Sequence, residues 1–302
     1  MSKKANFLYA ILLLFFFCKS IYAIETNIVQ KDGVIVQYEK SLQTVAKEII
    51  RIYPAVKREL EKTFGSEIEF RPTVILTDNR KDFRKMVGND LVVAIAVPQN
   101  NLIVIDNSKM KTGPFTLEIT LKHELCHLLL YHYTEGGNLP KWLNEGISQW
   151  VTGGISEMIM GENKNLLKQA TLSGRFIPIK DLATRFPNDD KNLMLAYQES
   201  RSMVDYIDRE FGPGKILQIL RHLKNGDNAD TAILKGLSIS PEELESNWHD
   251  FIRKKFTWFT YLSSHLYQLL FFLAALILIY GFIQFIIKKR AYRDEEEDDT
   301  IV

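Results

Sequence analysis

The feature that most constrains the fold of this chain is a pair of histidines four residues apart, in the run His123-Glu124-Leu125-Cys126-His127. Residues four apart lie on one face of an α-helix, so a helix here offers both imidazoles to a single metal ion. Apolar residues recur at helical spacing on both sides, from Phe115 to Lys122 and again from Leu128 to Leu130. We therefore predict that the run lies within one helix.

A glutamate follows in the run Trp142-Leu143-Asn144-Glu145-Gly146, eighteen positions after His127. Pro140 is typical of the start of a helix and Gly153-Gly154 of its end, which places Glu145 in the middle of a second helix, facing inward. Zinc takes nitrogen and oxygen ligands tetrahedrally, and a catalytic site uses three protein ligands and one water. We predict that His123, His127 and Glu145 bind Zn²⁺.

Glu124 is not needed as a ligand and is free to act as the general base. Zinc lowers the pKa of a bound water from near 15.7 toward about 7, so a carboxylate can take its proton. The alternative is a buried helix whose histidines bond to backbone carbonyls. That alternative leaves Glu124 and Glu145 without partners, which is costly for buried charges. The metal interpretation gives all four side chains a role.

These residues resemble the gluzincin metallopeptidases, the group of thermolysin and aminopeptidase N. The string Trp142-Leu143-Asn144-Glu145-Gly146 is similar to the third-ligand helix of aminopeptidase N. The resemblance extends to the compact peptidase MA-like domains of bacteria, in which a helix like Ala196-Tyr197-Gln198-Glu199-Ser200 and a helical tail ending near Trp248 follow. It covers Gly33 to Phe256 and is most specific at the metal residues.

Two departures from these relatives limit what the resemblance implies. The Gly-Ala-Met-Glu-Asn motif, with which aminopeptidase N holds the free amine of a substrate, does not occur here, so exopeptidase action is not implied. Thermolysin-like enzymes carry an aspartate one turn after the ligand glutamate, where this chain has Ser148 and Gln149. Partners of this kind orient a ligating histidine, and their identity in this chain stays open.

Tyr197 is the candidate for a further catalytic role. A phenol near the metal can stabilise the oxyanion of a tetrahedral intermediate, and the resemblance implies a tyrosine from a helix downstream of the third ligand. The alternative is a packing tyrosine, because Leu193, Met203 and Tyr206 lie along the same candidate helix. Cys126, inside the metal-binding run, is predicted to be a small buried hydrophobic residue.

The N-terminus has the regions of a secretory signal peptide. Lys3 and Lys4 precede an apolar run from Phe7 to Phe17, and residues 1–23 end with Ala23, after which cleavage is expected. Ile21 is not the small residue usually found two positions earlier, so an uncleaved anchor is the alternative.

Residues 266–287, Leu266 to Ile287, are almost continuously apolar and long enough to cross a bilayer. We predict a transmembrane helix here, preceded by a juxtamembrane segment over 257–265 and followed by a charged cytosolic tail over 288–302. Basic residues flank both ends, so the signal peptide decides the orientation and places the intervening domain outside the cytoplasm. The exported domain has no Asn-X-Ser/Thr site, which favours a bacterial cytoplasmic membrane.

Residues 24–256 have the composition of one globular domain. A formal net charge of +1 gives no argument for nucleic acid as a partner. We expect strands over Val34 to Tyr38, Ile68 to Leu76, Leu91 to Val97 and Leu102 to Ile105. A helical region over Leu42 to Phe64 can be kinked or broken at Pro54, and nearly all of the chain after Thr116 is expected to be helical. Ser240-Pro241-Glu242-Glu243 predicts the start of the last soluble helix.

This order predicts an α+β, zincin-like domain with an N-terminal mixed sheet and a mostly helical C-terminal lobe, followed by one transmembrane helix. The predicted function is that of a membrane-anchored, extracytoplasmic zinc metallopeptidase with a peptide or protein substrate. If a strand between Leu91 and Ile105 is the sheet edge beside the metal, an extended peptide can add to it. One alternative is a zinc hydrolase of another amide or ester. The other is a non-catalytic zinc-containing binding module, which would have no use for Glu124.

Overall fold

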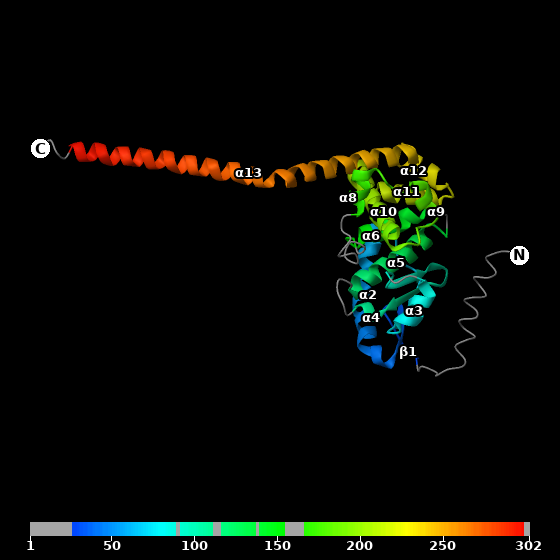
Figure 1. The fold of residues 1–302 in the computed structure, drawn as a ribbon. Coiled ribbons are helices and arrows are strands. Elements are labelled where there is room, and N and C mark those ends of the chain that lie inside the picture. The colour runs from blue at the N-terminus through cyan, green and yellow to red at the C-terminus, as the bar shows by residue number, and fades with distance from the viewer. Residues whose placement is uncertain (1–25, 89–90, 111–115, 137–138, 155–165, 299–302) are drawn as a thin grey trace. The chain divides into compact units, whose positions relative to one another are not determined.

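The computed structural model describes residues 26–88, 91–110, 116–136, 139–154 and 166–298 (Figure 1). The predicted signal peptide therefore lies outside the described residues. The chain divides into two units, residues 1–248 and residues 249–302. The first unit contains the sheet and the helices around it, and the second consists of most of the last helix.

The sheet has five strands in the order β1-β2-β3-β5-β4 and is mixed, as predicted. The two inner pairings, β2 with β3 and β3 with β5, are parallel, whereas β1 pairs with β2 and β4 with β5 in antiparallel fashion. Both outer strands are therefore sheet edges. The strands are β1 (Thr26–Lys31), β2 (Val34–Glu39), β3 (Thr73–Thr77), β4 (Ala94–Val97) and β5 (Leu102–Asp106).

Three parts of this region differ from the expectations, the first being that the strand predicted from Leu91 begins only at Ala94. The strand predicted from Ile68 begins only at Thr73, because the Ile68 N–H donates to the Glu61 carboxylate at 2.8 Å and the buried Ile68 packs as part of a loop. No strand was predicted for β1, although Asp32-Gly33 is a strong hairpin signal. Both turn residues have positive φ, 51° and 89°, and Lys31 pairs with Val34 across the turn.

Helices surround this sheet and make up most of the rest of the first unit. Helix α2 (Gln43–Phe64) continues through Pro54, so the possible break there does not occur. It buries Ile49, Val56 and Leu60, and it contacts both β2 and α5 (Leu117–Tyr133). Its packing therefore compensates for the hydrogen bond that proline cannot make. Two short helices, α3 (Arg80–Val87) and α4 (Asn107–Met110), were not predicted.

After Thr116 the described chain is almost all helix, as predicted. Figure 1 shows α5 and α6 between the part of the unit that contains the sheet and the part that contains α8 to α12. The fold is thus an α+β domain with an N-terminal mixed sheet. The helices are α6 (Lys141–Val151), α8 (Leu166–Ser173), α9 (Ile179–Thr184), α10 (Asp190–Phe211), α11 (Lys215–Lys224), α12 (Ala229–Leu237) and α13 (Pro241–Asp298).

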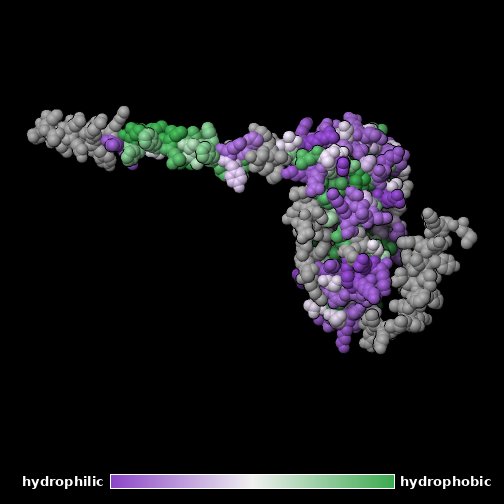
Figure 2. Space-filling model, viewed as in Figure 1, coloured by the Kyte–Doolittle hydropathy of each residue, from purple (hydrophilic) through white to green (hydrophobic). Residues whose placement is uncertain are grey.

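Helix α13 begins at the capping sequence that was predicted, since the Ser240 hydroxyl accepts a hydrogen bond from the Glu243 N–H at 3.1 Å. The helix continues through residues 257–265. Within it, His265–Lys289 is long and apolar enough to cross a membrane, by length and composition. Figure 2 shows these apolar side chains along the second unit. Several are largely exposed, including Tyr267 and Phe271.

Candidate metal centre

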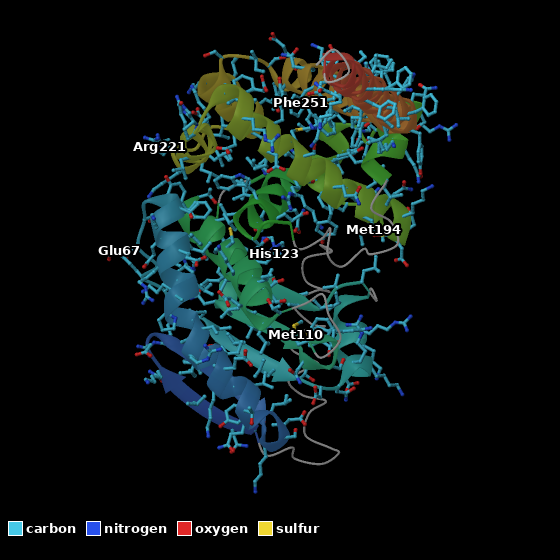
Figure 3. All side chains as sticks on the ribbon, turned by 90° about the vertical axis from the view of Figure 1, so that its left-hand side faces the viewer. Glu67, Met110, His123, Met194, Arg221 and Phe251 are labelled. Atoms are coloured by element: carbon cyan, nitrogen blue, oxygen red, sulfur yellow. The ribbon has the colours of Figure 1, made fainter. Side chains whose placement is uncertain are left out.

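Two helices carry the predicted ligands. Helix α5 begins after Thr116, whose hydroxyl accepts a hydrogen bond from the Ile119 N–H, and His123 and His127 occupy successive turns of it. Helix α6 begins after Pro140 and carries Glu145 near its middle. The two helices pack against each other. Figure 3 shows His123 near the centre of the first unit, on α5 between the sheet and the C-terminal helices.

The three predicted ligands converge on one point. Their candidate ligand atoms all lie within 4.8 Å of one another. The Nε2 atoms of His123 and His127 lie 3.7 Å and 3.6 Å from Glu145 Oε2. These distances are too long for hydrogen bonds, but they are close to the separation of about 3.3 Å between neighbouring ligands around tetrahedral zinc. The donor set and its geometry fit Zn²⁺, so the predicted metal role has structural support.

Asn144 holds the ring of His127. Its Oδ1 atom lies 2.8 Å from His127 Nδ1, and because a carbonyl oxygen only accepts, the Nδ1–H must donate. The proton is then on Nδ1, which leaves the Nε2 lone pair free for a metal. Asn144 was part of the quoted sequence string, but no role was predicted for it. Only the packing of α6 on α5 reveals this contact.

Ser148 is the second neighbour of His127. Its hydroxyl oxygen lies 3.2 Å from the same Nδ1 atom and also forms a hydrogen bond with the thiol of Cys126. Cys126 is fully buried, as predicted. Burial raises the pKa of its thiol to about 12, so the thiol stays neutral. Asn144 and Ser148 are thus the two side chains that contact His127 Nδ1.

The charges of Glu145 and its neighbours favour a cation at this point. Burial opposes ionisation of Glu145, but His127, His123 and Lys141 together hold its pKa below the ordinary value. Glu145 therefore carries a negative charge between the two histidines. The Nδ1 atom of the buried His123 has no hydrogen-bond partner among the described residues.

Glu124 lies beside the ligands and faces the sheet. Burial raises the pKa of Glu124 to about 7, with Glu145 adding to the shift and His127 opposing it. The Ala96 N–H of strand β4 donates a hydrogen bond to the Glu124 carboxylate. A carboxyl group that is tuned toward neutrality and held at a sheet edge is suited to accept and return a proton.

Tyr197, on α10, lies within electrostatic range of this site. Burial raises the pKa of its phenol well above the ordinary range, and the negative charges of Glu145 and Glu124 raise it further. The charges of both carboxylates therefore act on the phenol, which stays protonated. The ring also packs against the apolar cluster of Leu166, Ala170, Met194 and Leu195, as the packing interpretation predicts, and the catalytic role of Tyr197 stays a prediction.

Close packing of α6 and α10 sets the position of Tyr197. A Cβ atom on Gly146 would lie only 2.5 Å from the Ser200 carbonyl oxygen, so glycine permits the two helices to approach. The buried Gln149 then donates its Nε2–H to the Tyr197 carbonyl oxygen at 3.1 Å. Neither residue had a predicted role, because each acts through a helix that is distant in sequence.

Comparisons with known proteins agree with the resemblance to metallopeptidases. The chain matches the family model described as Peptidase MA superfamily over residues 73–254, more than half of its length, and this range contains every site residue named above. No curated protein matches the chain.

Three solved structures are similar in part, each with a TM-score of 0.43. The M1 zinc metallopeptidase of Deinococcus radiodurans is 14% identical and is matched over 74% of this chain and 51% of its own. Yeast LTA4 hydrolase with bestatin is 12% identical, over 80% and 37%. Legionella pneumophila aminopeptidase A with aspartic acid is 12% identical, over 74% and 27%. This chain thus spans about half of these proteins or less. The family match, which agrees with the gluzincin resemblance, identifies the chain as a member of the peptidase MA superfamily.

Proposed function

We propose that the chain is a zinc metallopeptidase, anchored in a membrane, with its catalytic domain outside the cytoplasm. The observation that carries the proposal is the convergence of His123, His127 and Glu145 with Glu124 beside them. A structural zinc site usually has four protein ligands and needs no base. The three-ligand set with an adjacent carboxylate therefore favours hydrolysis over a purely structural role.

The site residues have separate tasks in this proposal. His123, His127 and Glu145 hold zinc, which when bound activates water and polarises a carbonyl group. Glu124 accepts the proton of the attacking water and delivers it to the nitrogen of the leaving amine. Tyr197, which stays protonated, donates a hydrogen bond to the oxyanion that forms on the substrate carbonyl. Asn144 keeps the His127 ring in the orientation for binding.

The sheet edge supplies a place for an extended substrate. Strand β4 is an outer strand, and its residue Ala96 contacts Glu124. The Val93 carbonyl accepts from the Asp106 N–H of the neighbouring strand, so by alternation the backbone groups of Ala94 and Ala96 face the outer edge, where the Ala96 N–H donates to Glu124. A peptide that pairs with this edge would bring its backbone to the metal centre. We propose an extended peptide or unfolded protein segment as the substrate.

The proposed location rests on the two ends of the chain. Residues 1–23 are proposed as the signal peptide, 24–256 as the peptidase domain, 257–265 as the juxtamembrane segment, 266–287 as the transmembrane helix and 288–302 as the cytosolic tail. The apolar part of α13, His265–Lys289, supports the membrane partner by length and composition. A protease applied to intact cells should digest the catalytic domain and leave a C-terminal tag intact, and the reverse pattern would contradict this orientation.

The central experiment compares the full-length wild type with Glu124→Gln in detergent. Bound zinc is measured by mass spectrometry of the metal, and cleavage is followed on a peptide library. Glu118→Gln is the matched control, because Glu118 is exposed on the same helix. We expect zinc in all three proteins and cleavage by the wild type and the control alone.

Other outcomes separate the alternatives. Zinc without peptide cleavage, but with hydrolysis of small amides or esters that requires Glu124, would identify a different zinc hydrolase. Zinc without any hydrolysis would favour a binding module. A wild type that binds no zinc would contradict the central proposal.

A further inference from the structure

Phe186 touches the proposed oxyanion residue and has no role in the mechanism above. It follows α9 in the chain, is buried, and its ring centroid lies 5.1 Å from that of Tyr197 with an angle of 85° between the two planes. This is the edge-to-face arrangement that aromatic pairs prefer. Phe186 therefore restrains the direction in which the Tyr197 phenol points.

The other surroundings of Phe186 include a hollow. With Ile177, Asp181, Thr184, Arg185 and Pro187, it lines an open hollow of about 490 Å³. A further contact would help to keep the buried Phe186 ring against Tyr197. The structure supplies one in the form of a lysine.

That contact comes from Lys141, the first residue of α6. Its Nζ atom lies over the Phe186 ring, 5.0 Å from the centroid, which is within the range of a cation–π interaction. Lys141 also precedes Glu145 by one helical turn, and its charge acts on the Glu145 carboxylate. One ammonium group thus lies over the ring that supports Tyr197 and acts electrostatically on the third proposed ligand.

We infer that Lys141 and Phe186 are positioning residues, which hold the Tyr197 hydroxyl where the substrate oxyanion forms; this inference rests on the proposed function. A site of this kind must be held within about 0.5 Å and 10–20° of its productive geometry. A small tilt of the Tyr197 ring moves its hydroxyl, at the far end of the side chain, by more than this tolerance. Loss of either support should therefore weaken stabilisation of the transition state and leave substrate binding unchanged.

The test is a double-mutant cycle on the full-length, zinc-loaded protein. Phe186→Leu keeps an apolar side chain but removes the ring, and Lys141→Met keeps the stem but removes the charge. Each is made in the wild type and in Tyr197→Phe, and kcat and KM are measured for one peptide. In the wild type we expect each change to lower kcat about ten-fold with KM within two-fold, because the lost interaction exists only in the transition state.

In the Tyr197→Phe background the same changes should lower kcat less than two-fold, because the hydroxyl that they position is already absent. Lys141→Arg should keep most of the activity, since arginine also binds the face of an aromatic ring. Lys224→Met is the control: it removes a cation 5.6 Å from the Tyr133 ring and should leave kcat unchanged. Lys141→Met removes no aromatic side chain from the interior, so it decides the question if Phe186→Leu does not fold.

A second measurement does not depend on turnover. A phosphinic peptide carries a tetrahedral oxyanion, and its affinity for the zinc-loaded proteins is measured by calorimetry. We expect the same ten-fold loss, again only when the Tyr197 hydroxyl is present. Equal losses in both Tyr197 backgrounds, or a rise in KM with kcat unchanged, would overturn the inference. A protein that cleaves no peptide would contradict the proposed reaction. The inference would still be supported if the variants lost affinity for the phosphinic peptide only when the Tyr197 hydroxyl was present.

Discussion

Replacing Gly146 by alanine should damage the site without removing any of its functional groups. A Cβ atom at this position would lie 2.5 Å from the Ser200 carbonyl oxygen and 2.6 Å from Val204 Cγ2. The closest neighbour is backbone and cannot rotate away, so α6 and α10 must separate. Overpacking of this kind costs about 1–3 kcal/mol, whereas alanine gains about 1 kcal/mol over glycine within a helix. We expect a net destabilisation of about 0–2 kcal/mol.

The effect on activity should be larger than the effect on stability. Tyr197 lies one turn before Ser200 on α10, so a shift of that helix moves the phenol away from Glu124 and Glu145. Displacements of about 1 Å can cost about a hundred-fold in rate. We expect Gly146→Ala to keep its zinc, to lose at most about 8 °C in melting temperature, and to show kcat reduced about 10- to 100-fold.

The matched control is Gly236→Ala, also within a helix. There the added Cβ atom would meet Ile219 Cγ1 at 2.8 Å, a side-chain atom that can move, and the position lies on α12, outside the proposed site. This variant should keep its kcat. The assays are thermal unfolding, zinc content and peptide cleavage. If Gly146→Ala retained zinc and cleaved at the wild-type rate, the argument that close packing of α6 and α10 positions Tyr197 would be wrong.

Three further predictions concern other parts of the chain. Asn144→Ala should weaken zinc binding about 10- to 100-fold, because His127 loses the acceptor that orients it; competition with a chelator measures this, and unchanged affinity would refute it. Burial raises the pKa of Glu199 from its ordinary value of 4.5 to about 8. Between these two pH values the folded protein keeps the proton on Glu199, whereas the unfolded chain releases it. The free energy of unfolding therefore falls as pH rises from about 4.5 to 8. Glu199→Gln, which can still accept from the Ile177 N–H, should therefore gain a few kcal/mol over the wild type near pH 8 and little at pH 4.5, as denaturant unfolding at both values would show. Finally, placing four aspartates within residues 270–285 should release the chain from the membrane fraction, and retention there would contradict the proposed span.

Local signals in the sequence were enough to predict the two helices, α5 and α6, that carry the proposed metal ligands. The spacing of His123 and His127 and the position of Glu145 after Pro140 depend only on helical geometry over a few residues, and the structure brings the three together. The capping sequence at Ser240 is equally local and was also correct. The failures have local reasons too: the turn at Asp32-Gly33 carried a hairpin signal that was not used, and the apolar Ile68 lies in a loop.

Contacts between distant segments required the tertiary structure. Nothing in the sequence near Glu124 indicates that the Ala96 N–H bonds to it. Nor does the sequence indicate that Asn144, adjacent to one proposed ligand, contacts the ring of another. Strand order and the choice of β4 as the edge beside the site also depend on how helices cover the sheet. Each of these contacts joins residues whose separation in the sequence bears no relation to a helical or strand period.

By itself, the sequence predicted the candidate metal-binding residues, the family, the α+β class and the apolar segment near the C-terminus, because each follows from residue type and short-range periodicity. Only the tertiary structure decided the surroundings of the candidate site: the Asn144 contact with His127, the close approach of α6 and α10 at Gly146, and the contacts of Phe186 with Lys141 and Tyr197. The physical reason is that helix periodicity fixes which side chains share a face, whereas the free energy of packing, summed over the whole core, fixes which faces meet.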